Sequence, residues 1–352
     1  MKRVNHIFEK FVSMDNLRKA AEDAADKKHH YHAVKKFYAN LENNLADLQT
    51  DLLMGTYELG EYRIKQIHER GKDRKIYILP FRDRIVQRAL GNVLDPILLR
   101  RLNECTHASI KGRGIHSAKN QVEKYLKDVE GTQYCLKIDI HHYFQSIDHI
   151  VLKEQWRKVI KDKKILEIID KIIDSVPPDE GVPIGNYFSQ IAANLYLSWF
   201  DRWVKTVLKI KYYMRYMDDM VFFAKTAWEL RKQFREIDWK LCSELHLSIK
   251  ENWQIFKVDA RAVDVVGYRM GHGNTILRKT TFQNVRRSCN VVARRDCAEN
   301  LTYPEFCSVQ SLKGWSMHAN DTTIRENYYA PIEEKLNEFQ KLLKKPAHNL
   351  II

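Results

Sequence analysis

Apolar residues recur at helical spacing over much of the first half of the chain. Within 34–55 they repeat every three or four positions, which predicts one amphipathic helix after a shorter helix at 16–28. Another helix with a broad apolar face is expected from about Arg82, and Pro96 is expected to end it. The same periodicity predicts a helix over 151–174.

Alternating and β-branched segments predict the strands. The segments 62–67 and 75–79 alternate apolar and polar residues on either side of a Gly-containing turn, which is typical of a β-hairpin. The apolar segment 135–140 predicts a buried strand. Further along, 212–224 predicts a strand, a turn and a second strand, and 263–270 predicts another strand pair.

The order of these elements indicates the fold class. The mostly apolar segment 189–204 predicts a buried helix, and 226–246 predicts a helix after the second hairpin. Helices and strands in this order predict an α+β protein in which helices cover one face of an antiparallel sheet. Residues 276–352 are expected to be mainly helical.

The composition is that of a folded protein. With 44% hydrophobic and 30% charged residues, the 352-residue chain can bury a core, and its length suggests about two domains. The apolar runs are shorter than the ~18 residues of a membrane-spanning helix, and the N-terminus lacks the apolar block of a secretion signal. We therefore expect a cytoplasmic protein with no membrane association. The 6 Cys are scattered, which argues against a zinc knuckle or a disulfide framework.

The charge is unevenly distributed. The formal net charge is +14, and residues 61–119 alone carry 14 basic and 6 acidic side chains. Such a concentrated excess is typical of a surface that binds a polyanion, above all nucleic acid. A basic surface that serves only solubility is the alternative on charge alone. A membrane surface is disfavoured because the basic residues do not form one amphipathic helix.

Three acidic residues occupy positions where a strand or a tight turn is expected. Asp139 lies in the apolar strand 135–140, and Asp218 and Asp219 lie at the turn within 212–224. Asp is depleted in strands, and adjacent carboxylates in apolar surroundings repel each other unless a cation neutralises them. A plain hairpin turn is the alternative for the Asp218–Asp219 pair alone.

A shared sheet edge would make these acids a metal site. If the strand of Asp139 lies beside the hairpin, three carboxylates converge, and hard oxygen ligands of this kind bind Mg²⁺. Two such ions about 3.5–4 Å apart stabilise the attacking and leaving oxygens of a phosphoryl displacement. The chemistry indicated is nucleotidyl transfer on a polyanionic substrate.

Six short motifs resemble, in the same order, the motifs of reverse transcriptases. Tyr216-Met217-Asp218-Asp219 has the Y-x-D-D form of that family. The others are a fingers motif at 72–87, a second motif at 109–116, the first palm motif at 137–144, a lysine-bearing motif at 247–250 and a primer-holding hairpin at 265–268. Each motif is weak alone, and their common order carries the resemblance.

One loop indicates which group of reverse transcriptases the chain resembles most. Residues 184–190 have the form I-G-x-x-x-S-Q, where most bacterial reverse transcriptases have Q-G-x-x-x-S-P. This form resembles the reverse transcriptases of diversity-generating retroelements, within the group II intron-like superfamily. Another bacterial reverse transcriptase, such as a retron, abortive-infection or compact group II-like enzyme, is the alternative. A non-catalytic RNA-binding relict of such an enzyme is a further one.

The resemblance implies a right-hand polymerase that carries out RNA-directed DNA synthesis. Its implied parts are a helical N-terminal extension (1–60), fingers (61–134), a palm with an antiparallel sheet (135–275, including a helical segment at 150–180) and a helical basic thumb (276–352). The implied substrates are template RNA, a cDNA primer and dNTPs. Members of the retroelement family copy a template-repeat RNA into adenine-mutagenised cDNA, which diversifies a target gene, and they work with a small basic accessory variability determinant protein.

The resemblance also implies the catalytic residues. Asp139, Asp218 and Asp219 would hold two Mg²⁺ ions, with Mn²⁺ as a possible substitute, and Lys250 would protonate the pyrophosphate leaving group. By abundance alone, Lys250 would be a plain surface lysine.

The implied nucleotide site adds residues from several motifs. Lys72 and Arg74 would meet the triphosphate, Ile140 and Gly185 would line the site, and Phe144 would exclude the 2′-hydroxyl of a ribonucleotide. A solvated charge is the alternative for Lys72, and a core aromatic is the alternative for Phe144.

Ile184 is the implied fidelity residue. Its aliphatic side chain cannot make the hydrogen bond that a Gln there would make near the incoming nucleotide, and losing such a contact costs about 10–200-fold in selectivity. Because copying in the resembled family is error-prone opposite template adenines, the resemblance implies that Ile184 contributes to these errors. A core isoleucine before the buried helix is the alternative.

The remaining implied residues would contact the template–primer duplex, mostly through phosphates. They are Arg113, Gly267, Tyr268, Arg286, Arg287, Arg294 and Arg295. The net charge is compatible with RNA but does not identify a protein partner.

Overall fold

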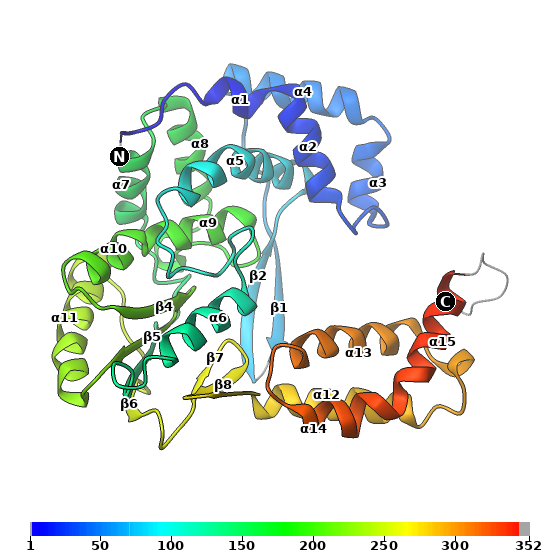
Figure 1. Ribbon diagram of the computed structural model, residues 1–352. Coiled ribbons are helices and arrows are strands. Elements are labelled where there is room, and N and C mark those ends of the chain that lie inside the picture. Colours follow the sequence, from blue (N-terminus) through cyan, green and yellow to red (C-terminus); the bar gives the residue numbers. More distant parts are fainter. Residues whose placement is uncertain (1, 70, 345–352) are drawn as a thin grey trace. The chain divides into compact units, whose positions relative to one another are not determined.

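The computed structural model describes residues 2–69 and 71–344, without the side chains of Glu69, Lys72 and Lys344. Figure 1 shows its helices and strands. The helices are α1 (Phe8–Val12), α2 (Met14–Ala25), α3 (His32–Tyr38), α4 (Leu41–Met54), α5 (Phe81–Leu99), α6 (Ile115–Leu126), α7 (His149–Val159), α8 (Lys163–Ile173), α9 (Tyr187–Tyr196), α10 (Ser198–Thr206), α11 (Ala227–Leu245), α12 (Lys279–Ala293), α13 (Tyr303–Ser316), α14 (Thr322–Ile324) and α15 (Glu333–Lys344). The strands are β1 (Arg63–Glu69), β2 (Lys72–Ile78), β3 (Tyr134–Asp139), β4 (Tyr212–Tyr216), β5 (Asp219–Ala224), β6 (Gln254–Lys257), β7 (Val263–Val265), β8 (Tyr268–Gly271) and β9 (Asn274–Leu277).

The chain forms two compact units, which we describe separately. The first comprises residues 1–112, 137–221 and 231–253, and the second comprises 113–136, 222–230 and 254–352. The points of division fall inside β3, β5 and α11, so these elements contribute residues to both units. Within the described ranges, 2–69 and 71–344, we find no helix that is long and apolar enough to cross a bilayer.

Helix α5 is the central helix of the first unit and packs against α2 and α9. Its apolar face, including Ile85, Leu90 and Leu94, is completely buried. Pro96 was expected to end this helix, but α5 continues to Leu99. A proline inside a helix removes one backbone hydrogen bond, and the burial of Leu98 in the core holds the last turn in place.

Three segments predicted as single helices are each two helices. The segment 34–55 breaks at Asn40, whose φ of −139° is not helical, and gives α3 and α4. The segment 151–174 breaks before Asp162, because the Asp162 carboxylate leaves the helix to accept the backbone N–H groups at the start of α1. The segment 189–204 is divided at Leu197, which lies between α9 and α10 and has backbone angles in the helical region.

The strand predictions at 62–67, 75–79, 135–140 and 212–224 are confirmed. Strands β1 and β2 form an antiparallel hairpin, in which Arg63 is opposite Ile78. Strands β4, β5, β3 and β6 form a four-stranded sheet in that order. The mixture of helices with separate antiparallel pairs confirms the predicted α+β class.

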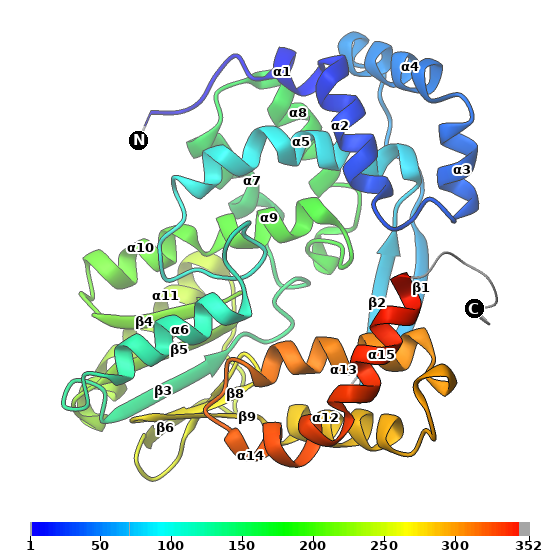
Figure 2. The same cartoon turned by 45° about the vertical axis from the view of Figure 1, so that its right-hand side comes forward.

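The second unit contains a small antiparallel sheet and most of the C-terminal helices. The segment 263–270 was predicted as a strand pair, and the structure adds β9 to give the order β7-β8-β9. Helix α6 packs against β8, and α12 lies along α13 (Figure 2). A capping box, formed by Thr302 and Glu305, begins α13.

Candidate active site

Two sheet strands bring the predicted carboxylates together. Asp139 is the last residue of β3, Asp219 is the first residue of β5, and these strands are neighbours in the sheet. Asp218 lies in the turn between β4 and β5, after Met217, whose φ of 57° is in the left-handed region. This tight turn leaves the Asp218 side chain at the end of the sheet, where Asp139 acts on it electrostatically.

The environment of Asp218 disfavours its negative charge. Burial, followed by repulsion from Asp139 and from Asp219, raises the pKa of Asp218 to about 6, although Lys250 acts in the opposite direction. Carboxylates held together in this way favour a bound cation, which removes the repulsion between them.

Two lysine side chains already face these carboxylates. The Lys250 ammonium forms an ion pair with Oδ1 of Asp139, and the Lys250 backbone N–H donates to the Asp139 carbonyl oxygen over 2.9 Å. An antiparallel bridge between Ile140 and Ile249 fixes this approach. Nζ of Lys137 lies 3.6 Å from Oδ1 of Asp219. Lys137 was not predicted as a site residue, although it lies two residues before Asp139 on β3 and therefore on the same face of the strand.

These carboxylates suit divalent cations that take their remaining ligands from substrate and water. Within the described part of the chain, no three His, Cys, Asp or Glu side chains are grouped so that they could hold a metal ion by themselves. Mg²⁺ usually binds one or two carboxylates and takes waters and substrate phosphates as its other ligands. Asp139 and Asp218 supply oxygens of this kind, and the Lys250 ammonium shows that a cation is accommodated beside Asp139.

A buried ion pair supports the turn that carries Asp218. Arg215 and Asp201 are both completely buried, and Nη2 of Arg215 donates to Oδ2 of Asp201 over 2.6 Å. Thr106 and Tyr213 donate their hydroxyl hydrogens to the same carboxylate, over 2.8 and 2.6 Å. Burial opposes the charge, but Asp201 raises the pKa of Arg215 above its usual value.

This ion pair reaches the turn of Asp218 through the backbone. Nη1 of Arg215 donates to the carbonyl oxygen of Met217 over 3.0 Å, directly before Asp218. Sequence analysis did not identify Arg215 or Asp201. The available signal was an acidic residue within the mostly apolar segment 189–204 and an arginine next to the Y-x-D-D box.

The fingers hairpin lies against the loop of Ile184 and Gly185. The Tyr77 N–H donates to the Ile184 carbonyl oxygen over 3.0 Å. Gly185 has a φ of 106°, and a Cβ there would lie 2.9 Å from Cγ2 of Ile76, so this contact requires glycine. The Ile184 side chain is half-buried.

Strand alternation assigns different surroundings to the basic residues of β2. Arg74 points to the same face as Ile76, which contacts the Gly185 loop, and its side chain is exposed. Lys75 points to the opposite face and pairs with Glu180, with Nζ and Oε1 2.6 Å apart. The Lys72 side chain lies outside the described residues.

Two further predicted nucleotide-site residues flank the end of β3. The half-buried Phe144 accepts the Val182 N–H at its carbonyl oxygen over 2.8 Å, which places it beside the loop of Ile184. Ile140 is completely buried, so its side chain belongs to the core and only its backbone is available to a nucleotide.

The predicted duplex-binding residues of the second unit fall into distinct environments. Arg286, Arg287 and Arg294 are exposed on or directly after α12, whereas Arg295 forms an ion pair with Glu305 in the capping box of α13. The charge of Arg295 is therefore paired with Glu305 at the N-terminus of α13.

The hairpin of Gly267 and Tyr268, predicted to hold the primer, is closely packed in the second unit. A Cβ on Gly267, whose φ is 89°, would lie 2.3 Å from the Trp315 ring. Tyr268 is buried, and its ring stacks on Trp315 with centroids 5.5 Å apart. Arg113 is half-buried at the start of this unit.

Two solved structures with similar folds are telomerases. Apo telomerase from Candida tropicalis matches 86% of this chain and 64% of its own, with a TM-score of 0.57 and 15% identity. Telomerase from Candida albicans, in complex with a fragment of telomeric RNA, matches 81% of this chain and 58% of its own, with a TM-score of 0.51 and 11% identity. These likenesses support the predicted right-hand polymerase fold.

Relatives by sequence include intron-encoded proteins. Protein YkfC of Escherichia coli (strain K12) is 29% identical over 47% of this chain and 46% of its own length. The group II intron-encoded protein LtrA of Lactococcus lactis subsp. cremoris is 26% identical over 49% of this chain and 30% of its own. The chain thus matches less than half the length of these curated relatives. The family model described as reverse transcriptase (RNA-dependent DNA polymerase) matches residues 65–270, more than half of the chain, and the chain belongs to this family.

Proposed function

We propose that this chain is an RNA-directed DNA polymerase. The observation that carries the proposal is the meeting of Asp139, Asp218 and Lys250 at the end of one sheet, in a chain of the reverse transcriptase family. In the proposed reaction a primer 3′-hydroxyl loses its proton to solvent and bonds to the α-phosphate of a dNTP, while the bond between the α- and β-phosphates breaks and pyrophosphate leaves. This reaction needs charge balance around the phosphates and a proton for the leaving group.

The side chains of the site supply both needs. Asp139 and Asp218 would bind divalent cations, Mg²⁺ or Mn²⁺, and Asp219 would help to hold the site's charge balance. Bound there, the cations would stabilise the attacking and leaving oxygens. Lys250 forms an ion pair with Asp139, and release from this pair would leave its ammonium free to donate a proton to pyrophosphate.

Residues on the hairpin and its facing loop would select the nucleotide. Arg74 would bind the triphosphate because it shares the face of β2 that meets the Gly185 loop. The Phe144 ring would lie under the sugar and exclude a 2′-hydroxyl. The Ile140 backbone would contribute to the floor of this site. Lys72 keeps its proposed triphosphate role from the sequence motif alone.

We propose the corresponding functional division of the chain. Residues 61–134 serve as fingers, 135–275 as palm and 276–352 as thumb, with 1–60 as an N-terminal extension. Arg113, Gly267, Tyr268 and the exposed arginines of α12 would position the template–primer duplex, Gly267 and Tyr268 by packing with Trp315.

We further propose that the enzyme belongs to a diversity-generating retroelement. The I-G-x-x-x-S-Q form of residues 184–190 supports this proposal. The enzyme would then copy a template-repeat RNA, make errors at adenines through Ile184, and act with a small basic accessory protein. A different bacterial reverse transcriptase would have no pair of near-identical repeats, differing at adenines, beside its gene.

Primer extension on an RNA template tests the polymerase proposal. The wild-type chain should extend a DNA primer when Mg²⁺ or Mn²⁺ is added, and Asp218→Asn should abolish extension. Asp238→Asn, which changes an exposed acid on α11, is the matched control and should retain activity. Equal extension by Asp218→Asn would overturn the metal site, and no extension by the wild type with either cation would favour the RNA-binding relict.

A further inference from the structure

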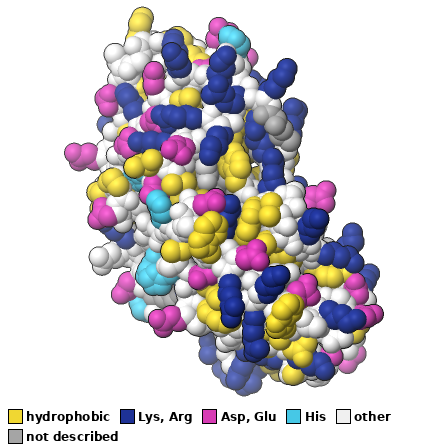
Figure 3. All heavy atoms as spheres, turned by 90° about the vertical axis from the view of Figure 1, so that its left-hand side faces the viewer, with side chains coloured by type: hydrophobic (Ala, Val, Ile, Leu, Met, Phe, Trp, Pro, Cys, Tyr) yellow, Lys and Arg dark blue, Asp and Glu magenta, His cyan; other side chains and the backbone are white. Residues whose placement is uncertain are grey.

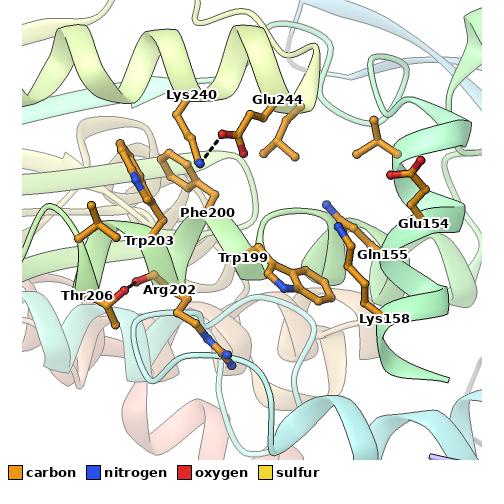
Figure 4. A pocket seen from close by; sticks show the side chains of 13 residues that line it. Glu154, Gln155, Lys158, Trp199, Phe200, Arg202, Trp203, Thr206, Lys240 and Glu244 are labelled. Carbon is orange, nitrogen blue, oxygen red and sulfur yellow. Dashed lines mark hydrogen bonds and ion pairs between the residues drawn. The ribbon is translucent and has the colours of Figure 1, made fainter. Parts of the chain in front are cut away.

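Two adjoining cavities open on the side of the first unit formed by α7 and α10. Their volumes are about 370 and 180 Å³, and both are lined by Lys158, Trp199 and Arg202. Figure 4 shows Trp199 between Arg202 on one side and Lys158 on the other. Neither cavity is lined by the carboxylates of the candidate active site.

The smaller cavity is strongly basic. Arg101 joins the three shared residues there, and burial together with the nearby Arg202 guanidinium lowers the pKa of Arg101. Nη2 of Arg101 donates to the Lys2 carbonyl oxygen over 2.7 Å. Among the residues that the structure describes, no carboxylate forms an ion pair with Arg101, Lys158 or Arg202.

The acids of the larger cavity do not neutralise this cluster. Glu244 is paired with Lys240 on α11, and Glu154 is an exposed acid on α7. Figure 3 shows this side of the molecule, where dark-blue Lys and Arg side chains are interspersed with yellow hydrophobic and magenta acidic ones. The combination of a partly exposed indole with unpaired cations therefore lies on an open surface.

This combination has a specific ligand chemistry. An aromatic face stacks an unpaired nucleobase, and neighbouring cations bind the phosphates on either side of it. A duplex hides its base faces, so it would use the cations and leave Trp199 without a role. An acidic peptide would likewise use the cations but would not require the indole.

We propose that Trp199, Arg101, Lys158 and Arg202 form a platform that binds a single-stranded segment of RNA outside the polymerase site. One base stacks on Trp199, and the flanking phosphates bind the three cations. The inference rests on the proposed function only in taking RNA as the polyanion that this protein meets. It is independent of the metal site.

Binding of a labelled single-stranded oligonucleotide to the full chain tests the proposal. Fluorescence anisotropy is measured with fluorescein-labelled oligouridylate, after saturation of the polymerase site with an unlabelled primer–template duplex. Trp199→Ala should weaken binding about tenfold, and Trp199→Phe should restore most of it because phenylalanine retains an aromatic face. Melting temperatures report whether either substitution at the half-buried Trp199 also affects folding, and the Phe variant should melt close to the wild type.

A charge-reversal pair tests the phosphate contacts. Lys158→Glu with Arg202→Glu should weaken binding at least tenfold and reduce the slope of log K against log salt by about 1.4, as expected for two lost contacts to a single strand. The control pair, Arg231→Glu with Lys232→Glu at exposed positions of α11, makes the same change in charge. It should weaken binding less than twofold, because salt screens charges that do not contact the RNA.

Three results would overturn the platform. They are an equal loss in the control pair, unchanged binding by Trp199→Ala, and displacement of the RNA by polyglutamate as effective as displacement by unlabelled oligouridylate. Extension of a short primer–template should be normal in all these variants. Failure of the platform would therefore be distinguishable from failure of the polymerase proposal.

Discussion

The guanidinium of Arg215 and the carboxylate of Asp201 form a completely buried ion pair, 14 residues apart along the chain. The pair joins α10 to β4, and Arg215 passes the connection on to the Met217 carbonyl oxygen. The geometry of the Asp218 turn thus depends on charged groups that no solvent or substrate reaches.

We predict that Asp201→Asn destabilises the protein by about 3–5 kcal/mol, because it leaves a buried guanidinium without its counter-charge. Asp264→Asn is the control, since its ion pair with Arg278 is partly exposed and should contribute less than about 1 kcal/mol. Denaturant unfolding measures both. A similar small loss in the two variants would contradict the prediction.

The double variant Asp201→Leu with Arg215→Met separates stability from function. Replacing both charges by apolar groups should recover most of the lost stability. It removes the hydrogen bond to the Met217 carbonyl oxygen, so primer extension should stay well below wild type at saturating dNTP. Full activity in a stable double variant would show that the turn does not need this support.

Asp218→Asn should stabilise the metal-free protein while it removes activity. The folded-state pKa of Asp218 is raised to about 6, so its contribution to stability is favourable at low pH and is lost as the pH rises through that value. At pH 8 the variant should therefore gain roughly 1–3 kcal/mol in free energy of unfolding, and the gain should shrink toward pH 4. Urea titrations in EDTA at both pH values measure it, and a pH-independent difference would refute this account.

Lys250→Ala should separate the proton-donor role from the ion-pair role. Loss of a general acid lowers kcat by about 10²–10⁴-fold, whereas loss of the competing ammonium at Asp139 should lower the Mg²⁺ concentration needed for half-maximal rate. Lys137→Ala, which removes the ammonium beside Asp219, is the control and should leave kcat within about tenfold. An unchanged kcat in Lys250→Ala would make this lysine structural.

Ile184→Gln should lower the error rate opposite template adenines, by up to about 10–200-fold if one positional contact is restored. Ile184→Leu keeps the aliphatic character and the volume, so its errors should match the wild type. Sequencing of cDNA from one RNA template gives both spectra. An unchanged adenine spectrum with Gln would return Ile184 to a packing role.

Alanine substitution should have different effects at the exposed arginines of α12 and at Arg295, which is paired with Glu305. Arg286→Ala with Arg287→Ala should weaken primer–template binding and reduce its salt slope by about one per lost phosphate contact. Arg295→Ala should mainly lower the stability of the capping-box region, because its partner is Glu305. Affinity titrations at several salt concentrations, with melting temperatures, distinguish the two results.

The local sequence predicted the strands and the approach of Asp139 to Asp218 well, because strand alternation and the apolar surroundings of Asp139 are properties of a few neighbouring residues. Helix boundaries were less predictable. The break before Asp162 depends on the N-terminal segment that its carboxylate binds, and the continuation past Pro96 depends on burial of Leu98. The Arg215–Asp201 pair was missed because the two residues lie on different elements. Their charges neutralise each other only when α10 packs against β4 in the folded chain.

The left-handed backbone of Met217 has a consequence for variation within the Y-x-D-D box. Arg215 binds the carbonyl oxygen at this position and not the side chain, so the chemical identity of the residue is unconstrained by that contact. The left-handed backbone itself favours asparagine or glycine, which adopt this conformation more readily than methionine does. A different residue at the second position of the box would therefore keep the hydrogen bond from Arg215, and with it the support of the two following acids, as long as its backbone adopts the left-handed conformation.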